Sequence, residues 1–275
     1  DLFEICEYLF LKENNLCITI ATNGGLKTGA YWKKLGKLFA RYGNRSRVVF
    51  GIDGLEDTNH IYRQNVIFKS VMRNAQAFID GGGEAEWQYL IFKHNEHQIG
   101  EAKELSEKMG FSKFFIVHTP RFAYTQKRDG YKVYTYKGKT YVLETADPEF
   151  GVRQNAQDFI DSIEAEEIDC KAAGNKEFYI DNGGRVVPCC WIGNSLDHML
   201  GNDASNPMRD RIMAMYDIEE MNVIRNDLVD TLQHDFFTDV MPMSWKTIDG
   251  DQCSSKTCKS FCSKKRNVRK NRVYL

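Results

Sequence analysis

The segment Leu16–Gly25, LCITIATNGG, decides the fold class of this 275-residue chain. Its first part, LCITIA, is a continuous apolar run rich in β-branched residues, which is typical of a strand buried on both faces of a parallel sheet. The run ends in Thr22-Asn23-Gly24-Gly25, whose residue types favour a turn. Helix-like sequence lies on either side, at 2–11 and 28–42. The segment therefore predicts a βα unit of an α/β domain.

Three more units of the same kind follow along the chain. Strand-like segments at 47–52, 85–92 and 113–118 alternate with helix-like segments at 66–81 and 96–109. Such alternation is typical of a parallel sheet whose strands are connected by helices. The first part of the chain is therefore predicted to be a parallel α/β domain.

The pattern changes after Pro120. The segments YKVYTY and TYVLET flank Lys137-Gly138-Lys139 and predict a hairpin, and a helix is expected at about 153–163. We interpret this region as a linker or a cover between two domains.

Polar residues come directly after several predicted strands. Asn23, Asp53, Asn95 and Thr119 all occupy such positions. In parallel α/β folds the carboxyl ends of the strands form the edge where ligands bind. Any one of these residues could simply form a turn, but their shared location favours a ligand site.

Charge and hydropathy argue against nucleic acid and membranes as partners. The chain has 37 Lys and Arg against 38 Asp and Glu, a formal net charge of −1, so no overall field attracts nucleic acid or an anionic membrane. The cationic stretch Lys264–Arg272 could contact phosphate, but a solvated tail is the favoured interpretation. No run reaches the roughly 18 apolar residues of a membrane-spanning helix, and DLFEICEYLF has no cationic leader. We expect a soluble, cytoplasmic protein without a membrane or nucleic-acid partner.

Cysteines are concentrated in the second part of the chain, and clustered thiols in a reducing compartment more often bind metal than form disulfides. Cys253, Cys258 and Cys262 have the spacing C-x4-C-x3-C, so three thiolates can converge on one centre. A hairpin is predicted around Asp181-Asn182-Gly183-Gly184, with strands at 178–180 and 185–187, and helical sequence follows at 208–232. Cys170 and Cys189 bracket this hairpin and are natural fourth ligands. Spacing alone does not decide between zinc and an iron–sulfur cluster.

The cysteine pattern resembles a known extension. Cys170, thirteen residues, Gly184, four residues and Cys189 look like the opening signature of SPASM and twitch domains, which follow radical S-adenosylmethionine (radical SAM) barrels and carry auxiliary [4Fe–4S] clusters. No cysteine follows Cys262, which favours one auxiliary cluster over two. The resemblance implies that the four cluster ligands are Cys170, Cys189, Cys258 and Cys262. Cys253 competes for one of these positions, and Cys190 is a spare thiol.

The first part of the chain resembles the barrel of the same family. The strand before ATNGG looks like its third strand, VVFGIDG like its fourth, and WQYLIFKHN and FFIVHTP like its fifth and sixth. Members commonly read SIDG in the fourth strand and contact S-adenosylmethionine there, whereas this chain has Gly51 in place of the serine. Carried over by position, the residues expected at the cofactor and substrate mouth are Thr22, Asn23, Gly24, Asp53, Lys93 and Asn95.

Two family motifs are missing. The chain has no CxxxCxxC loop for a catalytic cluster and no Gly-Gly-Glu strand before its first helix. Because residue 1 begins in mid-pattern and is not Met, we expect a fragment of a longer protein that does not generate a radical by itself. The expected architecture is a partial (βα)6 radical SAM barrel, about strands 3–6, at 1–125, a linker at 126–165, and a small cysteine-rich SPASM/twitch-like domain at 166–275.

For the full-length protein the resemblance implies a radical SAM oxidoreductase or peptide-modifying enzyme. It would cleave S-adenosylmethionine reductively to a 5′-deoxyadenosyl radical that abstracts a substrate hydrogen. The implied partners are a peptide or small-molecule substrate and a reductant such as flavodoxin or ferredoxin. Two alternatives stay open: a zinc-binding interaction module on an inactive α/β scaffold, and a barrel hydrolase that uses His94, His97 or Asp53.

Overall fold

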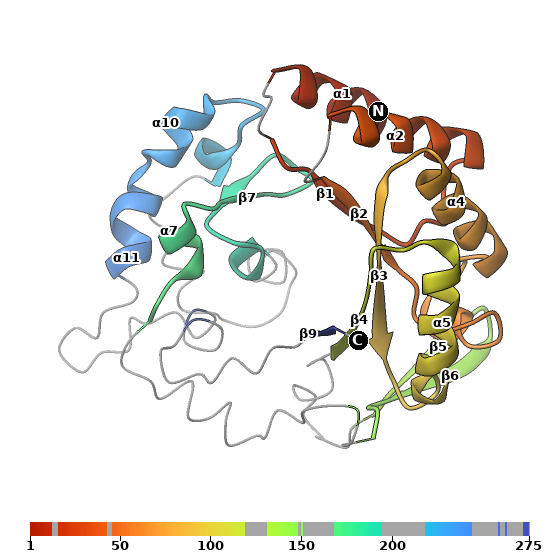
Figure 1. Ribbon diagram of the computed structural model, residues 1–275. Coiled ribbons are helices and arrows are strands. Elements are labelled where there is room, and N and C mark those ends of the chain that lie inside the picture. The colour runs from red at the N-terminus through yellow and green to blue at the C-terminus, as the bar shows by residue number, and fades with distance from the viewer. Residues whose placement is uncertain are drawn as a thin grey trace. The chain divides into compact units, whose positions relative to one another are not determined.

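The computed structural model describes residues 1–12, 16–42, 46–118, 131–147, 150, 168–193, 218–243, 258, 262 and 272–274. The chain divides into two compact units (Figure 1). The first contains Asp1–Gln154 and Arg269–Leu275, and the second contains Asn155–Val268.

The first unit is built on a parallel sheet. Its strands lie in the order β1-β2-β3-β4-β9, and the first four are parallel. The last strand, β9, joins β4 in the antiparallel direction, with Ile116 opposite Val273. The four predicted βα units are confirmed, whereas β9 was not predicted. The strands are β1 (Thr19–Thr22), β2 (Arg47–Gly51), β3 (Glu84–Ile91), β4 (Lys113–His118) and β9 (Arg272–Tyr274).

Helices cover one face of this sheet (Figure 1). They are α1 (Leu2–Lys12), α2 (Gly29–Tyr42), α4 (Phe68–Asp80) and α5 (Ile99–Met109). The predicted helix at 96–109 begins with a 3₁₀ turn, η1 (Glu96–Gln98), before α5. Aromatic rings fill the space between sheet and helices, and the ring of Phe78 lies 6.1 Å from Phe50 and 5.6 Å from Phe39, edge to face. This apolar layer holds the helices on the sheet.

Strand β1 differs from its prediction. The run LCITIA was expected to be buried on both faces, but the strand begins only at Thr19, and Thr19 and Ala21 are exposed. The reason is its place in the sheet, because β1 pairs with β2 alone among the described strands. Edge strands leave one row of backbone groups and part of each face to solvent.

The barrel itself is not shown. Within the described residues β1 and β9 are the two ends of the sheet and do not pair with each other. The fold that is shown is a mixed α/β unit with a four-stranded parallel sheet. Among the described helices, none is long and apolar enough to cross a membrane.

The predicted hairpin is confirmed as β5 (Tyr131–Tyr136) and β6 (Lys139–Glu144). It contacts α3 (Asn59–Tyr62), a short helix that was not predicted. The Tyr134 hydroxyl donates to the carbonyl of Ile61 and accepts from Gln64 Nε2 at 2.9 Å. Leu143 packs in a small apolar cluster with Leu90. The hairpin thus fixes the segment that follows β2.

The second unit contains short elements. The predicted hairpin is present as β7 (Tyr179–Ile180) and β8 (Val186–Val187), and Gly184 has φ 85°, which favours glycine. The predicted helix over 208–232 is wrong for its described part, which holds two separate elements. The first, η3 (Ile218–Met221), ends at Met221, and the second, α10 (Leu228–Leu232), begins where the Asp227 side chain accepts a hydrogen bond from Val229 N at 2.7 Å. Asn222 and Asn226 bond to backbone in the turn between. Residues 208–217, like the predicted helix at 153–163, lie outside the described residues. The other helical elements are α7 (Lys171–Asn175), η4 (Phe236–Val240) and α11 (Met241–Met243).

Candidate functional site

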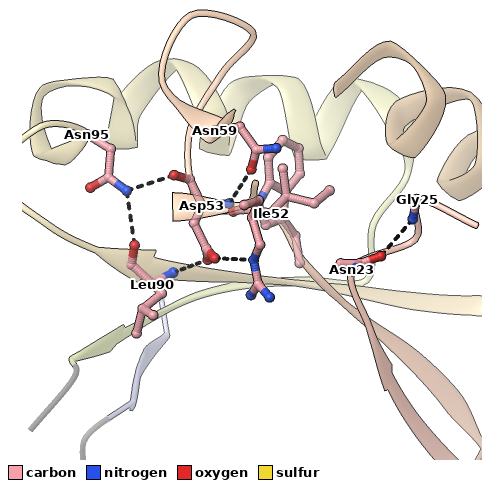
Figure 2. A network of polar contacts seen from close by, with 9 residues as sticks. Asn23, Gly25, Ile52, Asp53, Asn59, Leu90 and Asn95 are labelled. Atoms are coloured by element: carbon pink, nitrogen blue, oxygen red, sulfur yellow. Dashed lines mark hydrogen bonds and ion pairs between the residues drawn. The ribbon is translucent and has the colours of Figure 1, made fainter. Parts of the chain in front are cut away.

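Asp53 is the centre of a buried polar network at the carboxyl end of β2 (Figure 2). Its side chain has no exposed surface. Oδ1 accepts a hydrogen bond from Leu90 N at 2.7 Å, and the Asp53 backbone N–H donates to Asn59 Oδ1 at 2.9 Å. A buried carboxylate needs such donors to offset its lost hydration. Asp53 therefore holds the ends of β2 and β3 and the start of α3 together.

Asn95 fixes the next strand end. It is fully buried, and its Nδ2 donates to the carbonyls of Asp53 at 2.8 Å and Leu90 at 3.0 Å (Figure 2). Its Oδ1 accepts from Phe92 N at 2.7 Å, and its carbonyl accepts from the Tyr89 hydroxyl at 2.7 Å. Burial raises the pKa of Tyr89 far above its ordinary value, so the phenol stays a neutral donor. Both the nitrogen and the oxygen of the Asn95 side-chain amide are therefore used to hold the ends of β2 and β3 in place.

Arg63 brings a cation to this edge. Its Nε donates to Asp53 Oδ2 at 2.5 Å, and its side chain keeps 25% of its surface exposed. Among the described residues, Asp53 alone is hydrogen-bonded to the guanidinium, so the outer nitrogens remain able to donate. The guanidinium also lies beside Gly51, where a Cβ would be 2.5 Å from Nη2. A guanidinium held in this way is suited to a carboxylate or phosphate ligand.

Lys93 lies at the same end of β3 but is paired. Its Nζ lies 2.6 Å from Glu96 Oε1 and 2.5 Å from Asp147 Oδ2. These hydrogen bonds, first to Asp147 and then to Glu96, raise the pKa of Lys93. Glu96 also accepts from Asp147 N at 2.7 Å. In this arrangement Lys93 ties the turn after β3 to the segment after the hairpin.

The turn after β1 uses its own side chains. Thr22 Oγ1 accepts from Gly24 N at 3.0 Å, and Asn23 Oδ1 accepts from Gly25 N at 2.9 Å (Figure 2). Gly24 is buried with φ 68°, and a Cβ there would be 2.8 Å from a ring carbon of Phe50. The structure thus places Thr22, Asn23 and Gly24 in the framework of the turn, while Asp53 and Asn95 join one network.

Sequence reasoning missed Arg63. The signal was available: a lone cation ten residues after the buried Asp53, just beyond a short polar segment that follows the strand. Arg63 was overlooked because the short helix α3 was not predicted, and this helix is what returns the chain to the end of β2.

The hydrolase alternative uses His94, His97 or Asp53, and His94 is the more buried of the two histidines. The ring nitrogens of His94 are buried without a hydrogen-bond partner among the described residues, and its ring stacks on Phe92 at 5.3 Å. Burial, together with His60 and His97, lowers the pKa of His94 to about 4. A base that is orientated by no hydrogen bond lacks the partner that nucleophilic catalysis needs, so the geometry gives no support to His94 as a catalytic base.

Three cysteine segments meet in the second unit. The Asp169 N–H, next to Cys170, donates to the carbonyl of Cys262 at 2.7 Å. Burial, and to a smaller extent the nearby Cys262 thiol, raises the pKa of Cys189. Cys189 also packs against the apolar cluster that contains the buried Cys258. These contacts join the segment before the hairpin, the segment after it, and the carboxyl-terminal pair. Cys253 lies outside the described residues.

The surroundings of Cys189 are partly apolar. Burial raises the pKa of its thiol, while the N–H groups of Ile192 and Trp191 act in the opposite direction. Residues 190–193 form a helical turn, so the Cys189 sulfur lies at a helix start. The neighbouring Cys190 is exposed and Cys170 half-buried. Sulfur donors from three segments in a partly apolar shell are chemically suited to an iron–sulfur cluster. Within the part of the chain that the structure describes, no three His, Cys, Asp or Glu side chains are gathered as ligands of a single metal ion.

Comparison with known proteins gives a limited likeness. No protein-family model matches the sequence, and no curated protein matches it. A crystal structure of Streptococcus suis SuiB and one of SuiB bound to S-adenosylmethionine each match at 17% identity with a TM-score of 0.45, over 85% of this chain and 51% of theirs. SuiB bound to the precursor peptide SuiA matches at 16% identity with a TM-score of 0.47, over 94% of this chain and 56% of SuiB. The chain thus spans about half the length of these structures.

Proposed function

We propose that this chain is part of a radical SAM enzyme and that its second unit holds one auxiliary [4Fe–4S] cluster. The observation that carries the proposal is the meeting of Cys189, Cys258 and Cys262 with the Cys170 segment. These thiols belong to the pattern that resembles SPASM and twitch domains, and they come from stretches up to about 90 residues apart in the chain. Cys258 is buried and the other three are half-buried, and three separate cysteine segments in one small region favour a shared centre over independent packing.

The cluster ligands that we propose are Cys170, Cys189, Cys258 and Cys262. Cys253 is the competitor for one position, and Cys190 is the spare thiol because it is exposed. The Cys262 carbonyl is fixed by the Asp169 N–H, so the backbone beside two of the ligands is already held in place. Such preorganisation lowers the conformational entropy lost on binding a cluster.

The second part of the proposal concerns S-adenosylmethionine at the carboxyl edge of the parallel sheet. The support is the resemblance of ATNGG and VVFGIDG to strands that contact this cofactor, together with the geometry of Arg63. Its guanidinium lies at the end of β2, held by Asp53, and suits the carboxylate of the methionine moiety. The turns near this guanidinium are shaped by Thr22, Asn23, Gly24 and Asn95. Lys93 pairs with Glu96 and Asp147 at the end of β3.

When bound, S-adenosylmethionine supplies a radical on one-electron reduction, and an auxiliary cluster supplies a redox centre or a binding point. The residues of this chain orient these groups and exclude water. A peptide is the proposed substrate and flavodoxin or ferredoxin the proposed reductant, and both proposals rest on the resemblance alone.

Cysteine variants test the cluster. The wild-type chain, purified anaerobically, should be brown, absorb near 400 nm and contain about four irons. Cys258→Ser should lose most of this iron, because it removes a buried ligand. Cys190→Ser is the matched control and should keep it. Equal iron in both variants, or a colourless protein with one zinc, would contradict the proposal and support the zinc-binding module.

A further inference from the structure

Gly51, the last residue of β2, stands where the resembling enzymes commonly have serine. A Cβ at this position would lie 2.5 Å from Arg63 Nη2 and 3.3 Å from Arg63 Cζ. Real Cβ atoms are essentially never found closer than 3.0 Å to a heavy atom outside their own residue and its two chain neighbours. The space beside the strand end is therefore filled by a side chain from another segment.

The guanidinium cannot leave this space without losing its anchor. Its Nε is bonded to Asp53 Oδ2 at 2.5 Å, and Asp53 is itself held by Leu90 N. Asp53 has no exposed surface, so displacing Arg63 would break an ion pair whose acidic partner is fully buried. A flexible arginine would normally make room for an added methyl group, but this one is fixed.

We propose that Gly51 is a positioning residue for Arg63. The missing side chain leaves the volume in which the guanidinium lies, and Arg63 Nη2 supplies the donor that the resembling enzymes take from the serine. The ligand class for this donor is a carboxylate, and the proposal rests on the proposed function for its identity as S-adenosylmethionine.

Gly51→Ser restores the residue of the resembling enzymes, and the resemblance alone predicts equal or tighter binding of S-adenosylmethionine. The geometry predicts the opposite, because the new Cβ and hydroxyl displace the guanidinium. The expected loss is about tenfold in affinity, as for one charge-assisted hydrogen bond.

Isothermal titration with S-adenosylmethionine tests this in four proteins: wild type, Gly51→Ser, Arg63→Gln and the double variant. Gly51→Ser and Arg63→Gln should each bind about tenfold more weakly, and the double variant no more weakly than Arg63→Gln alone. Gly100→Ala is the control, since a Cβ there meets nothing within 4 Å, and it should bind like the wild type. Binding of Gly51→Ser that equals or exceeds the wild type would overturn the proposal, as would losses that multiply in the double variant.

Urea unfolding without ligand separates this proposal from the proposed function. Gly51→Ser should lower the unfolding midpoint in the wild-type background and leave it unchanged in the Arg63→Gln background. If even the wild type binds no S-adenosylmethionine, the proposed function fails, and this coupling alone decides whether Gly51 positions Arg63. Equal shifts in both backgrounds would overturn the positioning role.

Discussion

Replacing Arg63 by methionine removes the cation and keeps a side chain of similar length. The carboxylate of Asp53 then stays fully buried and keeps the Leu90 N–H, but it loses its ion pair with Arg63. Breaking a buried ion pair from one side costs about 3–5 kcal/mol, and the partial exposure of Arg63 places the expected loss near the lower end, at about 3 kcal/mol. For a unit of this size, such a loss lowers the melting temperature by about 6–12 °C.

Thermal and urea unfolding, followed by circular dichroism, measure this loss. The double variant Asp53→Asn, Arg63→Met removes both charges and should recover part of this loss, because the buried carboxylate is removed together with its cation. Arg41→Met, at the exposed end of α2, is the control and should change stability by less than about 0.5 kcal/mol. An Arg63→Met protein as stable as the Arg41→Met protein would refute the network.

Two other substitutions give separate tests of the first unit. Gly36→Ala should cost about 2 kcal/mol of unfolding free energy, because its Cβ would lie 2.2 Å from the Phe78 carbonyl between α2 and α4. Gly29→Ala in the same helix is the control, since its Cβ would meet only ordinary contacts. Equal urea midpoints for the two variants would count against close packing of these helices. The lowered pKa of His94, about 4, means that the folded state prefers the neutral ring, so its contribution is present above pH 6.5 and is lost as the pH falls toward 4. His94→Phe should reduce the loss of stability between pH 7.5 and 4.5 by about 1 kcal/mol after solvent screening, and an unchanged pH dependence in urea unfolding would contradict this.

Most of the parallel sheet was predictable from sequence, because hydrophobic runs and helix periodicity are local signals. Strand Lys113–His118 and the end of α2 at Tyr42 match their predictions. The edge position of β1 was not predictable from its apolar run, since exposure depends on which strands are neighbours. Strand β9 was missed because its three residues, RVY, carry no pattern apart from their pairing with β4.

The site was predicted in part. Asp53 and Asn95 follow their strands and meet in one network, as their position suggested. The turn residues Thr22 and Asn23 bond to their own backbone, which no spacing rule distinguishes from ligand contact. Arg63 and Gly51 are linked only through space, so the meaning of the missing serine depends on coordinates.

Metal and sulfide analysis of the anaerobically purified wild-type chain tests the central claim most directly. Thiolates from Cys170, Cys189, Cys258 and Cys262 around one cubane predict about four irons and four acid-labile sulfides per chain, with Mössbauer parameters of a [4Fe–4S] centre. One tightly bound zinc without sulfide, or a chain that holds no metal after reconstitution, would contradict it.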